Sequence, residues 1–329
     1  MDAHMTIESA NLLSGVWDKL AGDNILLRKE HLVQLENANP CNQKYHIFGN
    51  PEADSIVITY RLYLNIFTYG IANWKIPVTI IGIPCSVSKQ GFSMGIKTKN
   101  QILEFVRNLK GSKLILNTEN VSLDHFAMGK TLPTCQLNIG WNTFEEYLLD
   151  MRSHYRYRAG KALKKWNQIQ TVELEDNIEF DEELYQLYLQ VYEKSDYKLE
   201  KLSIDFFKTF PARIIKFQES GNTLGFIQLL ENKEELIFLM GGFDYGLNHR
   251  YDIYFNMLLK IIRLGIEGGY GTIDMGQTAE DTKMKLGCIR VEKFMYIHHS
   301  NRVVNFLVRR FIGLLSYKEK DFKYKVFRR

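Results

Sequence analysis

The spacing of apolar residues predicts a mixture of strands and helices in the first half of the chain. Two runs rich in Ile, Val, Tyr and Thr, Ser55–Phe67 and Ile76–Pro84, predict the strongest strands. In Lys99–Leu109 the apolar residues recur at positions i, i+3, i+4 and i+7, which predicts a helix. Weaker patterns predict a helix over Glu8–Leu20 and strands over Tyr45–Gly49, Lys113–Asn117 and Thr134–Ile139.

The pattern changes near residue 143. From Thr143 to Trp166 there is no proline and one glycine, Gly160, and the apolar residues follow one helical stripe. Basic residues cover much of the remaining surface: Arg152, Arg156, Arg158, Lys161, Lys164 and Lys165. We predict one long basic helix that joins two halves of the chain, with a boundary near residue 145. Its basic face is interpreted either as a surface for RNA or an acyl-carrier protein, or as a solvated helix face.

The second half has a clear order of elements. It begins with a strand, Thr171–Leu174, and two helices, Asp181–Glu193 and Ser203–Phe210. Three consecutive strands are then predicted: Ala212–Gln218, Asn222–Leu230 and Glu235–Phe243. A loop, Asp244–Arg250, leads to a helix, Tyr251–Glu267, and a crossing strand, Thr272–Met275, follows. A helix at Ala279–Leu286 and a strand at Arg290–His298 complete it. This order predicts an α+β fold with mixed, mostly antiparallel sheets and flanking helices.

Length and composition place the chain among soluble globular proteins with two domains or one large one. Its 329 residues are 45% hydrophobic and 24% charged, which excludes disorder for most of the length. No apolar window reaches the ~18 residues of a membrane span, and the first residues lack a signal-peptide pattern. Four cysteines are spread singly, without Cys-x-x-Cys spacing, so we expect reduced, buried thiols in a cytoplasmic protein.

Charge is concentrated at the end of the chain. The net charge is +4, but residues 301–329 carry nine basic residues against two acids, a local charge of +7. Within this tail Arg302–Tyr317 is strongly apolar, with Arg309 and Arg310 in its middle. An amphipathic helix followed by a polybasic end is typical of contact with a membrane surface, so a membrane-associated protein is one interpretation. A core helix with a solvated basic end is the other.

Common catalytic signatures are missing. The sequence contains no G-x-G-x-x-G, no G-x-x-x-x-G-K-[ST], no H-E-x-x-H and no G-x-S-x-G. The adjacent pair His298 and His299 lies on a predicted strand, where neighbours face opposite sides, so the two are not expected to share a metal.

Two glycine-containing segments are the candidates for chemistry. Met240–Asp252 joins a strand to a helix, and a helix start offers free N–H groups to an anionic ligand. Gly269–Gly287 places a carboxylate, Asp274, at the end of a short strand, followed by a polar turn and Lys283. Each segment also has an ordinary interpretation, the first as a strand–helix loop and the second as a capped surface helix.

These segments resemble the final third of GNAT-fold N-acyltransferases. The resemblance lies in the helix Tyr251–Gly269, the strand and turn Thr272–Thr278 with their Asp-x-Gly, and a K-x-x-x-G run, Lys283–Gly287. It is closest to the branch related to Fem-type peptidoglycan aminoacyltransferases. The basic helix Phe144–Trp166 is similar to the opening of the same domain.

The resemblance also implies a domain organisation, because members of that branch usually carry two GNAT-like domains in tandem. It implies an N-terminal GNAT-like domain over residues 1–145 and a catalytic GNAT-like domain over 146–300. An apolar helix and a basic tail occupy 301–329.

The implied reaction is acyl transfer to an amine. In GNAT proteins the donor lies where the fourth and fifth strands part, and a backbone N–H of the fourth strand polarises the thioester carbonyl. On this chain those strands are Glu235–Phe243 and Thr272–Met275. The implied co-substrate is an acyl-CoA or acyl-carrier protein thioester, without a metal. The implied acceptor is an amine of a small molecule, a lipid or a peptide, and DNA is not an expected partner.

Catalytic roles follow only as implications of the resemblance. Lys283 would hold an anionic group of the donor or the acceptor. Tyr251 or Tyr254 would protonate the leaving thiolate, because a phenol can donate a proton from an apolar site. Asp274 would orient the amine or act as its base.

One departure from the family pattern concerns the donor. GNAT proteins that use coenzyme A carry [RQ]-x-x-G-x-[GA] after the fourth strand, but Asp244–Arg250 holds a single glycine. This leaves free coenzyme A, an acyl-carrier protein and an aminoacyl-tRNA open as donors, and also a non-catalytic GNAT-fold binding module. The expected donor-binding residues are Gly241, Gly242, Gly246, His249, Arg250 and Gln277.

Overall fold

The computed structural model describes residues 4–49, 52–65, 67, 74–85, 88–121 and 123–328. The chain divides into two compact units, neither of which is continuous in sequence. The first unit comprises Met1–Leu132, Tyr197–Phe206 and Glu292–Glu319, and the second comprises Pro133–Asp196, Phe207–Val291 and Lys320–Arg329. The first change of unit therefore lies between residues 132 and 133, whereas the sequence pattern predicts a boundary near residue 145.

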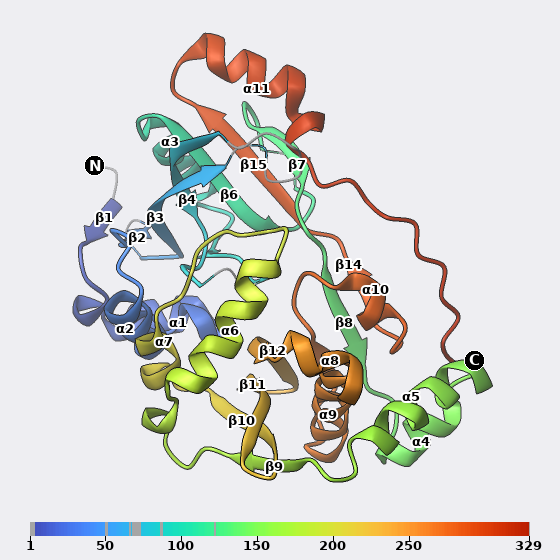
Figure 1. The fold of residues 1–329 in the computed structure, drawn as a ribbon. Coiled ribbons are helices and arrows are strands. Elements are labelled where there is room, and N and C mark those ends of the chain that lie inside the picture. The colour runs from blue at the N-terminus through green and yellow to red at the C-terminus, as the bar shows by residue number, and fades with distance from the viewer. Residues whose placement is uncertain are drawn as a thin grey trace. The chain divides into compact units, whose positions relative to one another are not determined.

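An eight-stranded sheet forms the first unit (Figure 1). Seven strands follow the order β1-β2-β3-β4-β6-β15-β7, and β5 pairs with β3. Their bounds are β1 His4–Ile7, β2 Lys44–Phe48, β3 Ser55–Asn65, β4 Lys75–Ile81, β5 Phe92–Ser93, β6 Ser112–Thr118, β7 Ala127–Lys130 and β15 Phe294–His299. All neighbours are antiparallel except β4 and β6, which are parallel because helix α3 returns the chain across the sheet.

Helices of the first unit are mostly short. They are η1 Ala10–Leu12, α1 Gly15–Ala21, η2 Ile25–Leu27, α2 Lys29–Ala38, α3 Lys99–Asn108 and α11 Arg302–Leu315. The predicted helix over Glu8–Leu20 is in fact η1 followed by α1. Helix α2, which buries Leu32 and Leu35, was not predicted. The predicted α3 is confirmed, with Ile102 and Val106 buried against the sheet.

A seven-stranded sheet forms the second unit, in the order β14-β8-β13-β12-β11-β10-β9. Its strands are β8 Thr134–Asn138, β9 Gln170–Glu173, β10 Arg213–Glu219, β11 Asn222–Asn232, β12 Glu235–Phe243, β13 Thr272–Asp274 and β14 Ile289–Val291. The predicted run of three antiparallel strands, β10, β11 and β12, is confirmed. The parallel crossover from β12 to β13 is confirmed as well.

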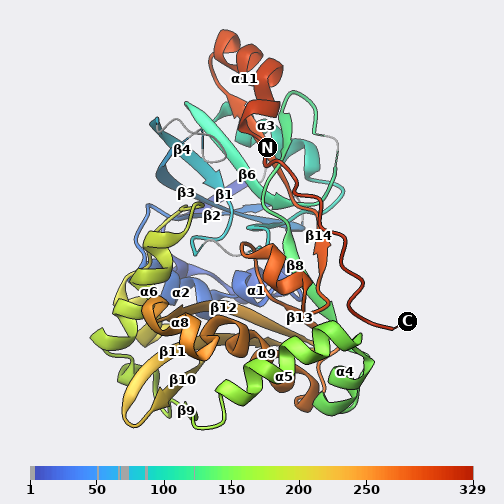
Figure 2. The ribbon, with the colours of Figure 1, turned by 45° about the vertical axis from the view of Figure 1, so that its right-hand side comes forward.

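Helices cover both faces of this second sheet (Figure 2). They are α4 Phe144–Asp150, α5 Ser153–Lys165, η3 Asn177–Glu179, α6 Glu182–Lys194, α8 Tyr245–Tyr251, α9 Ile253–Glu267 and α10 Glu280–Met284. Helix α7, Ile204–Thr209, spans the change of unit at 206/207. Because side chains alternate along β11, Ile227 faces the core shared with α9, whereas Phe226 contacts Phe180 and Phe207 on the opposite face.

Each sheet includes one strand from the other half of the sequence. Strand β8 comes from the end of the first half and lies between β13 and β14 in the second sheet. Strand β15 comes from the second half and lies between β6 and β7 in the first sheet. The predicted single strand Arg290–His298 is therefore wrong, because β14 and β15 are separate strands of different sheets.

The long helix predicted over Thr143–Trp166 is also broken in two. Met151 is extended, with φ −62° and ψ 142°, and forms a β-bridge with Phe327 near the chain end. The amide of Arg152 donates to the carbonyl of Val326 at 2.9 Å. This pairing replaces the helical hydrogen bonds and separates α4 from α5.

Candidate functional site

Strands β12 and β13 part after three residue pairs. The parallel ladder joins Glu235–Ile237 to Thr272–Asp274 and ends where β13 ends. Strand β12 continues to Phe243 and stays paired with β11 on its other edge. The backbone of residues 238–243 therefore has no β13 ladder beside it. This is the split that the sequence resemblance implies between a fourth and a fifth strand.

A β-bulge lies just beyond the split. Met240 is opposite Gln228 and Phe238 is opposite Leu229, so Leu239 is an extra residue on β12. A bulge increases the local twist and re-aims backbone groups. The bulge therefore changes the direction of the backbone N–H and C=O groups of β12 within residues 238–243, where β13 no longer pairs with it.

The two glycines at the end of β12 are explained by packing. A Cβ on Gly242 would lie 2.5 Å from the backbone nitrogen of Tyr188, so α6 lies directly against the strand. A Cβ on Gly241 would lie 3.0 Å from the ring of Phe238. The packing alone therefore requires glycine at Gly242, whereas at Gly241 a small shift of the Phe238 ring would make room, and the predicted role of both in donor binding stays a prediction.

Asp274 ends β13 and is 2% exposed. Its Oδ1 accepts hydrogen bonds from the Thr134 hydroxyl at 2.5 Å and from the Gly276 amide at 2.8 Å. Gly276 has φ +71°, a left-handed conformation that favours glycine. Asp274 thus fixes the turn after β13 and ties it to β8.

Lys283 closes the same turn from α10. It is 2% exposed, and its Nζ donates to the carbonyl oxygens of Gln277 at 2.7 Å and Gly276 at 3.2 Å. Burial lowers the pKa of Lys283, and the nearby thiols and the carboxylates of Asp274 and Glu280 oppose that shift. We name Thr134, Asp274, Gly276, Gln277 and Lys283 the Asp274–Lys283 cluster.

Two thiols and a phenol border this cluster. Burial raises the pKa of Cys135 to about 11 and raises that of Cys288 further, so both thiols are neutral at pH 7. Burial also raises the pKa of Tyr254 well above its usual range, with smaller contributions from both thiols. The Tyr254 ring stacks on Phe243 at a centroid distance of 5.5 Å. The structure therefore brings Tyr254, Asp274 and Lys283 to one region, with the phenol fully protonated.

The segment predicted as a loop, Asp244–Arg250, is mostly helix α8. Asp244 begins it, and its Oδ1 accepts from the Leu247 amide at 3.0 Å. An N-capping carboxylate is a sequence signal that indicates this helix. The start of α8 therefore already carries a negative charge, and Gly246 lies inside the helix.

The other predicted residues of α8 lie apart from the cluster. Tyr251 donates its hydroxyl to Glu219, and the Arg250 guanidinium lies 4.8 Å from the Tyr251 ring centroid. The carbonyl of His249 accepts from Lys165 at 3.1 Å. These contacts of Tyr251, His249 and Arg250 are made with Glu219, Lys165 and one another, and not with the Asp274–Lys283 cluster.

Two features of this region are not predicted from the sequence. Thr134 and Cys135 join it because β8 lies beside β13, which no local pattern indicates. Gln228 is the second: it is completely buried on β11 opposite Met240, and neither amide atom has a hydrogen-bond partner in the described structure. A polar residue inside the apolar run of β11 was the available signal. Among the described residues, no group of three His, Cys, Asp or Glu side chains is arranged to hold a metal ion.

Comparison with known proteins gives a result at the level of the fold. No family model and no curated protein matches the sequence. Among solved structures, the C-terminal domain of a protein described as a lysylphosphatidylglycerol synthetase from Agrobacterium fabrum is similar, with 8% identity and a TM-score of 0.55. The match covers 91% of this chain and 95% of that one. L-PGS from Bacillus licheniformis has 12% identity and a TM-score of 0.52, and the match covers 93% and 98% of the two chains.

A third similar structure carries the fold in its name. It is a tandem GNAT protein from the clavulanic acid biosynthesis pathway, with 9% identity and a TM-score of 0.51. The match covers 92% of this chain and 99% of that protein. At identities this low, the structural matches establish a shared architecture only. The chemistry has to be inferred from the residues of the site. The chain thus has the tandem GNAT-like fold that its sequence predicts, an α+β architecture with two mixed, mostly antiparallel sheets.

Proposed function

We propose that the chain is an N-acyltransferase that moves an acyl group from a thioester to an amine. The observation that carries this proposal is the split between β12 and β13 after Ile237 and Asp274, near a half-buried phenol, Tyr254, and a buried lysine, Lys283. A carbonyl in such a split can accept a hydrogen bond from a backbone N–H of the bulged strand. The tandem GNAT-like fold supports the same reaction class.

The reaction needs few groups from the protein. The lone pair of a neutral amine attacks the thioester carbonyl, the C–N bond forms and the C–S bond breaks. The leaving thiolate takes a proton, and the amide nitrogen loses one. Tyr254 is the better candidate for the proton donor, because it lies close to the thiols of Cys135 and Cys288 that border the cluster, whereas the Tyr251 hydroxyl donates to Glu219.

Lys283 and Asp274 act on the backbone in this proposal. The turn carbonyls accept from Lys283, and the Gly276 amide donates to Asp274, so the pair holds the turn that borders the split. This favours a positioning role for both over the direct contacts with donor or acceptor that the resemblance implies.

The form of the donor is a separate part of the proposal. At the start of α8, where a coenzyme A pyrophosphate lies in the family pattern, the Asp244 carboxylate already accepts the Leu247 amide. A second negative group at that place is disfavoured by like-charge repulsion. We therefore favour a thioester on an acyl-carrier protein over free acyl-CoA.

A second candidate function is supported by the exposed basic face of α5, which includes Lys161 and Lys164. In this version the donor is an aminoacyl-tRNA, as in a Fem-type aminoacyltransferase. The fold of L-PGS from Bacillus licheniformis is compatible with it. Binding through such a face would weaken steeply with salt, because each neutralised phosphate releases counterions.

The test compares donors on the full chain and then on two matched variants. Calorimetric titration with coenzyme A, acyl-CoA, acyl-carrier protein and aminoacyl-tRNA identifies the donor. With that donor, Tyr254→Phe is expected to lower kcat by about 10²-fold or more, the usual contribution of a general acid. Tyr251→Phe is the control and should retain most of the activity. A chain that binds none of the four donors would instead be a non-catalytic module.

A further inference from the structure

Helix α11 lies on the surface of the first unit and buries none of its residues. It packs on β7 and β15 (Figure 1), and the half-buried residues of the helix form a narrow stripe. Ile312 and Leu315 contact an apolar cluster of the sheet, and the Asn305 side chain accepts from the His299 amide at 3.0 Å. This stripe holds the helix in place and leaves the rest of its surface outward.

The outward surface of α11 is unusually apolar. Val303 is 68% exposed, Phe306 is 66% exposed and Leu314 is 62% exposed. Three more large apolar residues of the helix are exposed: Val304, Leu307 and Phe311. A contiguous exposed apolar surface of this kind on one helix is typical of an interaction site.

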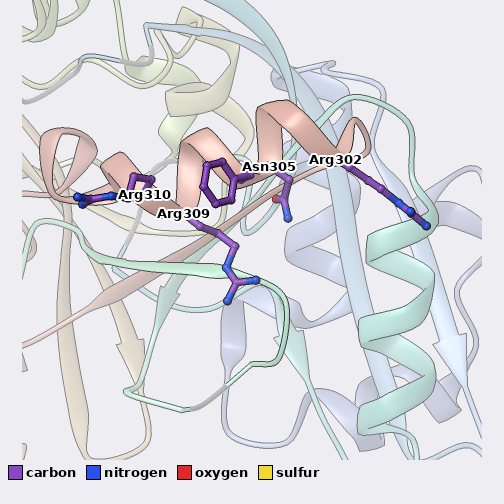
Figure 3. A pocket seen from close by; sticks show the side chains of 5 residues that line it. Arg302, Asn305, Arg309 and Arg310 are labelled. Carbon is purple, nitrogen blue, oxygen red and sulfur yellow. The ribbon is translucent and has the colours of Figure 1, made fainter.

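The same helix carries three arginines and no acidic residue. Arg302, Arg309 and Arg310 line a shallow groove of about 510 Å³ together with Asn305 and Phe306 (Figure 3). Guanidinium groups bind phosphate oxygens in a two-point geometry. The groove therefore combines sites for phosphate with an aromatic ring and neighbouring aliphatic side chains.

We propose that α11 docks on the surface of an anionic phospholipid membrane, with its axis in the plane of the bilayer. Its 14 residues would span at most about 21 Å at 1.5 Å per residue, and a kink at Phe311, with φ −114° and ψ 18°, shortens the straight part further. This is well short of the ~30 Å hydrocarbon core, so the helix lies on the membrane. No described helix is long and apolar enough to cross a bilayer. The apolar side chains enter the boundary of the acyl chains, and the arginines contact lipid phosphates.

The combination of arginines and exposed apolar side chains on α11 favours a membrane over a second copy of the chain or a nucleic acid. A second copy of the chain would place three arginines against three arginines, which repel each other. A nucleic acid would satisfy the arginines but would leave the aliphatic side chains of Val303, Leu307 and Leu314 in water. An anionic membrane satisfies both sets of groups.

The experiment is sedimentation of the full chain with vesicles of pure phosphatidylcholine or of phosphatidylcholine with 30% phosphatidylglycerol. We expect binding to the anionic vesicles, weakened by salt, and little binding to the neutral ones. The triple variant Arg302→Gln, Arg309→Gln and Arg310→Gln should lose about a hundredfold in affinity, at about fivefold for each arginine. Phe306→Ser with Leu314→Ser keeps the charge and should lose at least tenfold.

A matched control removes the same charge elsewhere. Lys97, Lys161 and Lys164 are exposed, and replacing all three by Gln should change the affinity less than threefold. Circular dichroism confirms that each variant is folded, which is expected because only exposed side chains change. Three results would overturn the proposal. The lysine control loses as much affinity as the triple arginine variant, the full chain binds neutral and anionic vesicles equally well, or it binds neither. Self-association lost in the Phe306 variant would instead assign the surface to a second copy. Binding is measured without any donor, so its outcome is separate from that of the transferase assay.

Discussion

Replacing Lys283 by Met tests whether this lysine holds the turn after β13. Met keeps much of the apolar stem but removes both hydrogen bonds to the carbonyl oxygens of Gly276 and Gln277. Each carbonyl oxygen left as an unpaired buried acceptor destabilises the fold by about 1–3 kcal/mol. Removing the buried ammonium group offsets part of this loss, because the cost of burying its charge disappears. We expect a net loss of about 3 kcal/mol in the free energy of unfolding.

Thermal unfolding followed by circular dichroism measures this loss. For a unit of 150–250 residues, 1 kcal/mol shifts Tm by about 2–4 °C, so Lys283→Met should lower Tm by about 6–12 °C. The matched control is Lys285→Met on the same helix. Its side chain is 43% exposed, and its ammonium pairs with Asp281 at 2.5 Å, an interaction worth about 1 kcal/mol or less. A Tm for Lys283→Met as close to the wild type as that of the control would show that the turn does not depend on Lys283.

Two further predictions concern packing and acid stability. Gly242→Ala places a methyl group 2.5 Å from the Tyr188 nitrogen and should lower the free energy of unfolding, measured with denaturant, by about 2–3 kcal/mol. Its control, Gly160→Ala, lies inside α5 with open space around it and should raise the free energy of unfolding by about 0.5–1 kcal/mol. Burial lowers the pKa of His46 to about 3 and that of His298 to about 4, so both stay neutral in the folded protein at pH values where the unfolded chain is protonated. Stability is therefore full above pH 6.5 and falls as the pH decreases below it, by about 2 kcal/mol for each histidine at pH 5. Replacing both by Gln should flatten the stability profile between pH 7 and 5, and an unchanged slope would contradict the assignment.

Periodicity was sufficient where an element is stabilised by its own amphipathic pattern. Helix α3 and strand β12 lie within one residue of their predicted bounds, because Ile102 and Val106 bury one face of the helix. Helix α8 was mispredicted as a loop although the sequence contains its N-cap, Asp244. Its seven residues are too few for a helical period to be recognised.

Contacts distant in sequence decided the breaks and the partners. The apolar stripe through residues 143–166 continues past Met151, but the bridge from Met151 to Phe327 ends α4 there. Nothing local to Met151 indicates that a segment 176 positions later pairs with it. The same holds for Gln228, whose unpartnered amide is evident only once its strand is buried.

By itself, the sequence determined the α+β class, the run of antiparallel strands and the position of the parallel crossover, because each depends on a short-range pattern of apolar residues. The tertiary structure alone decided that β8 and β15 each lie in the sheet of the other half. That placement brings Thr134 to Asp274 and completes the cluster beside the split. A strand's pattern specifies which face is buried but leaves its neighbours undetermined, since any strand edge offers the same backbone hydrogen bonds.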